Sequence, residues 1–208
     1  ISFIGGAIGS RLSMGGHTDD DSAHEVVIGN DVLAVSANYI RYPEQRRNGV
    51  AGRLDLYALW PGLQGFSEEN RLAFNNADLS KPLIFLSFEP RSLSKDMSGR
   101  LEPIYSQLFD GSGERLANGL TRYKLRKEAG FIDESILIGD RSDGTRFVVR
   151  CLMPDSLQDS IASCNRDVHV GEDLAMMARF PAPLLDQWQT LDLALLGFAA
   201  QTVKTVTP

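Results

Sequence analysis

The fold is decided by the stretch Thr145-Arg-Phe-Val-Val-Arg-Cys-Leu-Met153. Its side chains alternate with a period of two, so that neighbours point to opposite faces. One face is wholly apolar and carries Phe147, Val149, Cys151 and Met153. The opposite face is mixed and carries Arg146, Val148, Arg150 and Leu152. This pattern is typical of a half-buried antiparallel strand.

Turn signals on both sides extend this strand into an antiparallel meander. Upstream, Asp143-Gly144 predicts a tight hairpin turn, and the partner strand is expected over 135–139. Downstream, Gly171-Glu-Asp173 separates two further strand-like stretches, at 167–170 and 174–180. Three or four consecutive strands are therefore expected in this part of the chain.

The two cysteines of the chain, Cys151 and Cys164, lie at the two ends of one polar connector. Their number and placement predict a disulfide, which by chain entropy would stabilise the fold by about 3 kcal/mol. The alternative is two free thiols, one of them buried as a small apolar residue. The spacing does not match a CxxC redox or zinc pattern. A disulfide would indicate an oxidising compartment, such as the periplasm or the cell surface.

A C-terminal helix is expected after the meander, because Pro181-Ala-Pro183 is followed by apolar residues at helical spacing. These residues are Leu184, Leu185, Trp188, Leu191, Leu195, Phe198 and Ala199. The polar side of the same helix is expected to hold Asp186, Gln187, Gln189 and Asp192. The apolar stripe should pack across the apolar face of the meander.

The remaining elements complete an α+β domain with a largely antiparallel β-sheet. Further strands are expected at 25–28, 32–41, 53–60, 82–88 and 119–126. One or two shorter helices are expected near 67–76, with Ser67 as the N-cap, and 96–109, where Gly99 and Pro103 weaken the helical pattern. A β-sandwich with peripheral helices is the alternative fold.

The first 24 residues are expected to lie outside the globular domain, which would span residues 25–208. Residues 1–9 are apolar and rich in small residues, with Gly5 and Gly9 at a small-xxx-small spacing. We interpret them as the end of a single-span membrane anchor or of a signal sequence, with an N-terminal strand as the alternative. The acidic stretch up to His24 would then be a tether.

The net charge of −6 and the pI near 5.1 argue against a nucleic-acid-binding protein. Two local basic groups are candidates for an interaction surface. One is Arg46-Arg47 in the charged loop 42–49, and the other is Arg122, Lys124 and Arg126 on one face of a strand. Trp60, next to Pro61, is a further candidate. For each, ordinary solvated surface or packing is the alternative.

No GxSxG, HExxH, Walker A or GxGxxG motif occurs in the chain. The run His17, Asp19, Asp20, Asp21 and His24 is interpreted as solvated tether rather than as a metal site, and no cofactor is expected. His169 alone does not indicate a general base. Whether the chain is an enzyme is left open, although these observations favour a protein without catalysis.

Three functions remain after these arguments. The first is an exported or membrane-anchored domain that binds protein partners in the cell envelope, in the periplasm and with an anchor in the inner membrane. The second is a periplasmic enzyme whose site is assembled from dispersed Asp, Glu, Arg and His residues. The third is an acidic inhibitor or immunity-type protein that masks a basic partner.

Overall fold

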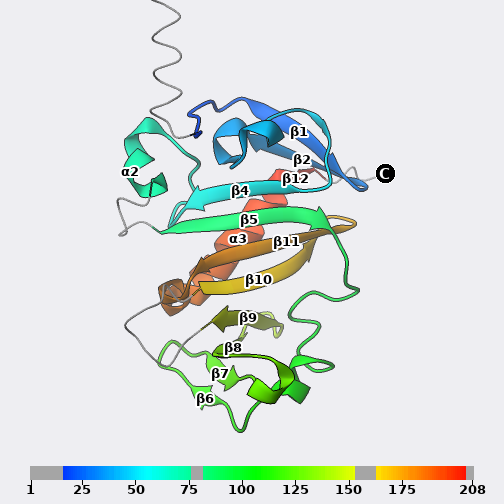
Figure 1. Cartoon of the computed structure of the whole chain (residues 1–208), viewed down its shortest axis with the longest axis vertical. Coiled ribbons are helices and arrows are strands. Elements are labelled where there is room, and N and C mark those ends of the chain that lie inside the picture. Colours follow the sequence, from blue (N-terminus) through cyan, green and yellow to red (C-terminus); the bar gives the residue numbers. More distant parts are fainter. Residues whose placement is uncertain (1–15, 76–81, 153–162, 205–208) are drawn as a thin grey trace, which may run out of the picture. The chain divides into compact units, whose positions relative to one another are not determined.

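A computed structural model describes residues 16–75, 82–152 and 163–204 of the chain (Figure 1). It has the predicted α+β fold, with mostly antiparallel sheets and a C-terminal helix. The chain divides into two compact units. Unit 1 consists of residues 1–90, 170–174 and 198–208, and unit 2 consists of residues 91–169 and 175–197.

The expected anchor or signal segment falls largely on residues 1–15, which lie outside the described residues. The expected single domain over 25–208 stays a prediction. None of the described helices is both long enough and apolar enough to span a membrane.

Unit 1 contains a four-stranded sheet with the strand order β12-β2-β1-β3. Strands β1 (Ala23–Ile28) and β2 (Asp31–Ser36) form the predicted antiparallel hairpin. The second strand is shorter than the expected 32–41, because a 3-10 helix, η1 (Ala37–Tyr39), follows it directly. The two outer strands are short: β3 (Gly49–Val50) is parallel to β1, and β12 (Val203–Lys204) is antiparallel to β2. Alternate residues of β2 are buried, as the sequence pattern predicts for a sheet with one covered face.

The second pair of strands in unit 1 carries an aromatic core. Strands β4 (Leu54–Leu59) and β5 (Leu83–Pro90) pair antiparallel, with Tyr57 opposite Phe85. A short helical segment, η3 (Glu68–Asn70) and α2 (Arg71–Phe74), supplies Phe74 to this core. The predicted helix start is confirmed, because the side chain of Asn70 accepts a hydrogen bond from the Ser67 N–H at 2.8 Å.

Unit 2 is built on the predicted meander. Its strands lie in the order β11-β10-β9-β8-β7-β6, and every pair with a determined register is antiparallel. Their bounds are β6 (Glu114–Arg115), β7 (Thr121–Lys124), β8 (Glu134–Asp140), β9 (Arg146–Leu152), β10 (Ser163–Val170) and β11 (Leu174–Pro181), the last of which begins in unit 1. Gly144 has φ 81° in the turn between β8 and β9, as Asp143-Gly144 predicted.

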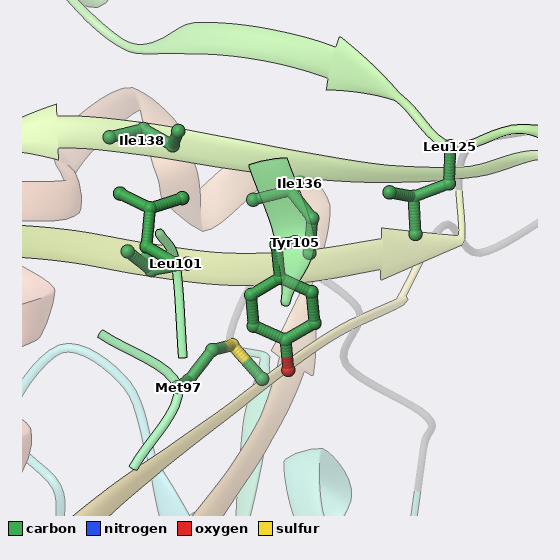
Figure 2. Packing of buried hydrophobic residues seen from close by; sticks show 7 residues of the cluster. Met97, Leu101, Tyr105, Leu125, Ile136 and Ile138 are labelled. Atoms are coloured by element: carbon green, nitrogen blue, oxygen red, sulfur yellow. The ribbon is translucent and has the colours of Figure 1, made fainter. Parts of the chain in front are cut away.

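One face of this meander is covered by the segment around residues 97–109 (Figure 2). The buried cluster there consists of Met97, Leu101, Tyr105, Leu125, Ile136, Ile138 and Val148. The apolar spacing therefore identified Met97, Leu101 and Tyr105 correctly as buried, but Ile104, which shares that spacing, is 45% exposed. The regular helix expected over 96–109 is not present, however, and only η4 (Tyr105–Leu108) is helical, as a 3-10 helix. Gly99 and Pro103 explain the difference, because both disfavour a continuous α-helix.

The opposite face of the meander is covered by the C-terminal helix. It begins as a 3-10 helix, η6 (Ala182–Gln187), and continues as α3 (Trp188–Thr202). The ring of Trp188 lies 4.9 Å from that of Phe147, and its Nε1 donates a hydrogen bond to the Asn118 carbonyl at 3.1 Å. Gly139 permits this close packing, because a Cβ atom there would lie 2.8 Å from the Trp188 ring.

The predicted disulfide between Cys151 and Cys164 is confirmed. The two residues lie directly opposite each other on β9 and β10, with their Cα atoms 4.0 Å apart, and both are fully buried. In one respect the expectation was wrong. Cys164 lies within β10, which begins at Ser163, and not ahead of a strand that begins at residue 167.

Candidate functional site

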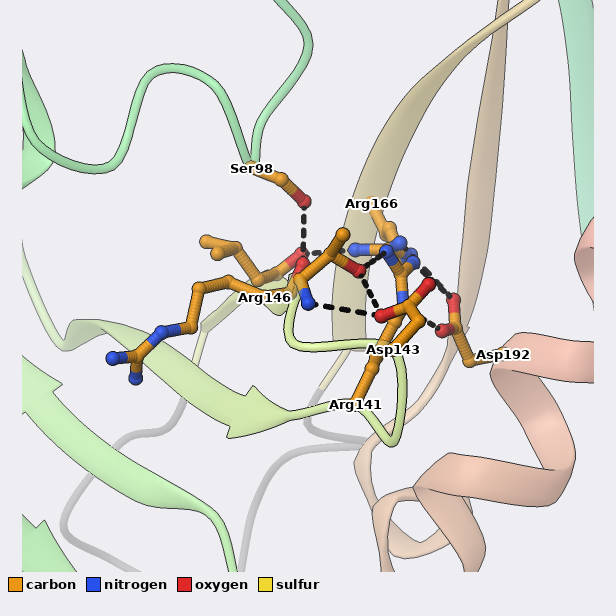
Figure 3. Close-up of polar contacts among 8 residues, drawn as sticks. Ser98, Arg141, Asp143, Arg146, Arg166 and Asp192 are labelled. Atoms are coloured by element: carbon orange, nitrogen blue, oxygen red, sulfur yellow. Dashed lines mark hydrogen bonds and ion pairs between the residues drawn. The ribbon is translucent and has the colours of Figure 1, made fainter.

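A buried network of arginines and an aspartate connects α3 with the meander of unit 2 (Figure 3). Asp192 on α3 receives Arg141 in a two-point contact, from Nε at 2.6 Å and from Nη2 at 3.1 Å. Arg166 on β10 forms an ion pair with the same carboxylate at 3.0 Å. Asp192 was expected on the polar side of the helix, but it is only 3% exposed, so that expectation is corrected.

Arg166 is held by three kinds of contact at once. Besides its ion pair, its Nη1 donates to the Val148 carbonyl at 2.7 Å, and its guanidinium lies 4.6 Å from the centre of the Phe147 ring. Burial lowers the pKa of Arg166 below its usual value, and the charge of Asp192 acts in the opposite direction. The Arg166 guanidinium donates to a carbonyl of β9 and forms an ion pair with a carboxylate of α3. It therefore links the helix to the sheet.

A second ion pair lies on the other covered side of the same strand. Arg100 binds Asp167 at 2.5 Å and also donates to the Tyr105 hydroxyl at 3.2 Å. Both charged groups are nearly buried. This pair therefore anchors the 97–105 segment in the way that the Asp192 network anchors α3. Neither network was found from the sequence, which gives no signal for pairs so distant along the chain.

The predicted basic face is present only in part, because β7 is shorter than the expected 119–126 and Arg126 lies beyond its end. The charges of these residues already have partners. Arg122 pairs with Glu114 at 2.5 Å, and Arg126 donates to the Gln107 carbonyl. Lys124 is exposed and also has an interaction partner. The opposite face of the strand is apolar as expected, since Tyr123 stacks on Phe109 at 4.2 Å.

The second predicted basic group lies in the loop that joins η1 (Ala37–Tyr39) to β3, and this loop is firmly held. Arg46 donates to the Ile40 carbonyl through Nε at 3.1 Å and to the Gly16 carbonyl through Nη2 at 2.8 Å. Gln45 accepts from the Asp55 N–H at 2.9 Å and donates to the Asp55 carboxylate at 3.1 Å. Arg47 is exposed. The loop thus presents its side chains from a fixed backbone.

The same loop contains Arg41, which the sequence did not mark as a candidate. The guanidinium of Arg41 is 5.0 Å from the centre of the Tyr42 ring and 4.8 Å from the centre of the Phe85 ring. Two such contacts hold the side chain in place by cation–π attraction. The Arg41-Tyr42 neighbours were visible in the sequence, but Phe85 lies far along the chain and gave no signal.

Behind the loop, His17 completes the aromatic core of unit 1. Its ring stacks on Phe66 at 4.9 Å, and its Nδ1 lies 2.9 Å from the Tyr57 hydroxyl. Burial lowers the pKa of His17 below its usual value, Asn75 acts in the opposite direction, and the charge of Arg46 lowers it further. His17 is therefore favoured as a neutral ring, which suits a packed position.

The remaining candidate, Trp60, is only 5% exposed. Its side chain therefore belongs to the buried core of unit 1. Within residues 16–75, 82–152 and 163–204, no group of three or more His, Cys, Asp or Glu residues is arranged to hold a metal ion.

Comparison with known proteins finds two similar structures. No protein family matches the chain, and no curated protein matches it in sequence. Its structure is similar to that of an immunity protein of the Stenotrophomonas maltophilia type IV secretion system, with a TM-score of 0.60 and 15% identity over 91% of this chain and 96% of that one. It is also similar to the iron-regulated outer membrane lipoprotein FrpD of Neisseria meningitidis, with a TM-score of 0.52 and 9% identity over 89% and 93%. At these identities the likenesses show a shared fold.

Proposed function

We propose that this chain is an exported domain of the cell envelope that binds a protein partner. The observation that carries the proposal is the shared fold. It covers about nine tenths of the chain in two proteins, one described as a secretion-system immunity protein and the other as an outer membrane lipoprotein.

The disulfide supports the location independently. Cys151 and Cys164 are fully buried and bonded between neighbouring strands. Disulfides of this kind persist in oxidising compartments and are rare in the cytosol. In this proposal, residues 1–24 are the end of an anchor or signal segment with its tether, and residues 25–208 are the domain on the far side of the membrane.

A second candidate function is that of an immunity-type inhibitor. The similarity to an immunity protein favours it, and the net charge of −6 would suit a basic partner. The two candidates differ in what binding does: an immunity protein abolishes a toxic activity, whereas another envelope module does not.

The location is tested by alkylation. The protein is expressed with export to the periplasm, denatured without reductant, treated with an alkylating reagent and weighed by mass spectrometry. We expect no alkylation until a reductant is added. Alkylation of both cysteines after export would remove the support that the disulfide gives to the envelope location.

Partner binding is tested by capture and titration. The immobilised protein is exposed to an envelope extract of the source organism, and any enriched protein is purified and titrated against it by calorimetry. We expect a saturable complex with one-to-one stoichiometry. Absence of any saturable partner would contradict the proposal and would favour the enzyme alternative. If the partner is toxic to cells, protection by co-expression identifies the immunity-type function.

A further inference from the structure

We infer that the segment 41–50 of unit 1 is a docking surface for an acidic segment of a protein partner. This inference rests on the proposed function, because it assigns the surface on which a protein partner would be recognised. It concerns Arg41, Tyr42, Arg46, Arg47 and Val50, which we call the arginine loop.

The first argument is a local excess of positive charge. The stretch 41–53 holds four arginines and one glutamate, in a chain whose net charge is −6. Of these arginines, Arg53 pairs with Asp55 and Glu89. In the described part of the chain, no carboxylate forms an ion pair with Arg41, Arg46 or Arg47. The basic face of β7 differs in this respect, since Arg122 there is already paired with Glu114.

The positive potential of the arginine loop shifts the pKa values of neighbouring groups. The charges of Arg46 and Arg41 both act to lower the pKa of Tyr57, against the larger effect of burial, which raises it. Arg46 acts on His17 in the same sense, by lowering its pKa. A concentrated positive region on an acidic protein is a favourable place for a negatively charged partner.

The second argument is preorganisation. Arg41 is held between the rings of Tyr42 and Phe85, and no hydrogen bond within the described residues occupies its guanidinium N–H groups. A planar guanidinium fixed in this way can bind a carboxylate at two points without first losing much side-chain freedom. The backbone of the loop is held by Gln45 and Arg46, so the surface exists before any partner arrives.

The third argument identifies the partner as protein rather than nucleic acid or lipid. The arginine loop also exposes apolar side chains, with Val50 82% exposed and Tyr42 37% exposed. Arginine and tyrosine are enriched at protein–protein interfaces, where an apolar contact is surrounded by charged groups. A segment with carboxylates flanking an apolar residue would match this arrangement.

The test uses a labelled peptide as probe. A fluorescent peptide of alternating glutamate and leucine residues is titrated by anisotropy at low salt, and ¹⁵N–¹H spectra report which groups respond. We expect shifts at the Nε–H of Arg41 and at the backbone of 41–50, and weaker binding as salt rises. Arg41→Ala/Arg47→Ala should weaken binding by on the order of tenfold or more. Arg41→Lys should give an intermediate loss, because it keeps the charge but not the planar group.

The matched control is Arg115→Ala/Lys127→Ala, which removes the same charge from two exposed positions of unit 2 and should leave binding unchanged. The inference is overturned if the peptide shifts no signal in 41–50, or if binding is lost instead in Arg122→Ala/Lys124→Ala. It is also overturned if anionic phosphatidylglycerol vesicles, but not the peptide, bind the loop.

The same variants separate this inference from the proposed function. If the wild-type protein captures a partner and Arg41→Ala/Arg47→Ala captures it equally well, the docking surface is wrong while the function stands. If the wild-type protein binds the acidic peptide through the loop but no envelope partner exists, the function is wrong while the surface stands.

Discussion

Replacing Asp192 with alanine should reduce the free energy of unfolding by about 3–5 kcal/mol. The carboxylate accepts two hydrogen bonds from Arg141 and faces Arg166 at 3.0 Å. The Arg141 side chain is 20% exposed and can regain water, but that of Arg166 is 2% exposed and cannot. The loss therefore comes mainly from leaving one buried guanidinium without its counter-charge.

The measurement is urea unfolding of the oxidised protein, followed by circular dichroism and by tryptophan fluorescence. Arg53→Ala is the control. It removes two ion pairs, with Asp55 and with Glu89, but the arginine side chain is 52% exposed, so the loss should be no more than about 1 kcal/mol. Asp192→Asn keeps the size of the side chain and one acceptor, so its loss should be smaller than that of Asp192→Ala.

A double variant tests the same reasoning by removing both buried charges. Arg166→Met combined with Asp192→Leu removes the buried charge together with its partner and should recover a large part of the stability that Asp192→Ala loses. The reasoning is refuted if Asp192→Ala costs less than about 1 kcal/mol, or if the double variant is no more stable than Asp192→Ala.

Three further predictions concern single features of the chain. Replacing both disulfide cysteines with alanine should cost about 3 kcal/mol in urea unfolding, and reductant should then no longer change the midpoint. Gly171→Ala should destabilise the protein more than Gly29→Ala does. Both glycines have φ near +60°, but only at Gly171 would the new Cβ meet Asp31, at 2.2 Å from Oδ1, so equal losses would contradict the close approach. The pKa of His17 lies below 6.5 in the folded chain. As the pH falls, the unfolded chain therefore binds a proton on this ring near pH 6.5, before the folded chain does so at its lower pKa. Stability should therefore decline over that range and be fully present above it, and His17→Gln should flatten that part of the profile measured by thermal unfolding.

The elements predicted from the sequence are those whose signals are local. The alternation in β9, the Asp143-Gly144 turn and the spacing in α3 each depend on neighbours within a few residues, and the structure has all three. The 96–109 segment shows the limit of periodicity. Its apolar spacing predicted the buried face, but spacing alone cannot show that the backbone between the anchors is irregular.

The candidate site was only partly predictable, because its contacts join distant parts of the chain. Arg46 and Arg47 were visible as a basic pair, but nothing near Arg41 in the sequence shows that Phe85 lies over its guanidinium. Asp192 has helical spacing that suits a polar face, and only the tertiary pairing with Arg166 explains its burial. Sequence patterns report which residues share a face, whereas charge pairing depends on which faces meet.

The composition of unit 1 from three separate chain segments has a kinetic consequence. Its four-stranded sheet is closed by β12, where Val203 pairs with Leu33 from 170 residues earlier in the chain. During synthesis, β1 and β2 can form their hairpin early, but this edge of the sheet cannot form until residues 203–204 have been synthesised. Contacts of such long range slow folding, because the intervening chain must be ordered or looped first. A chain interrupted anywhere before β12 would leave the edge of β2 open to pairing with another molecule.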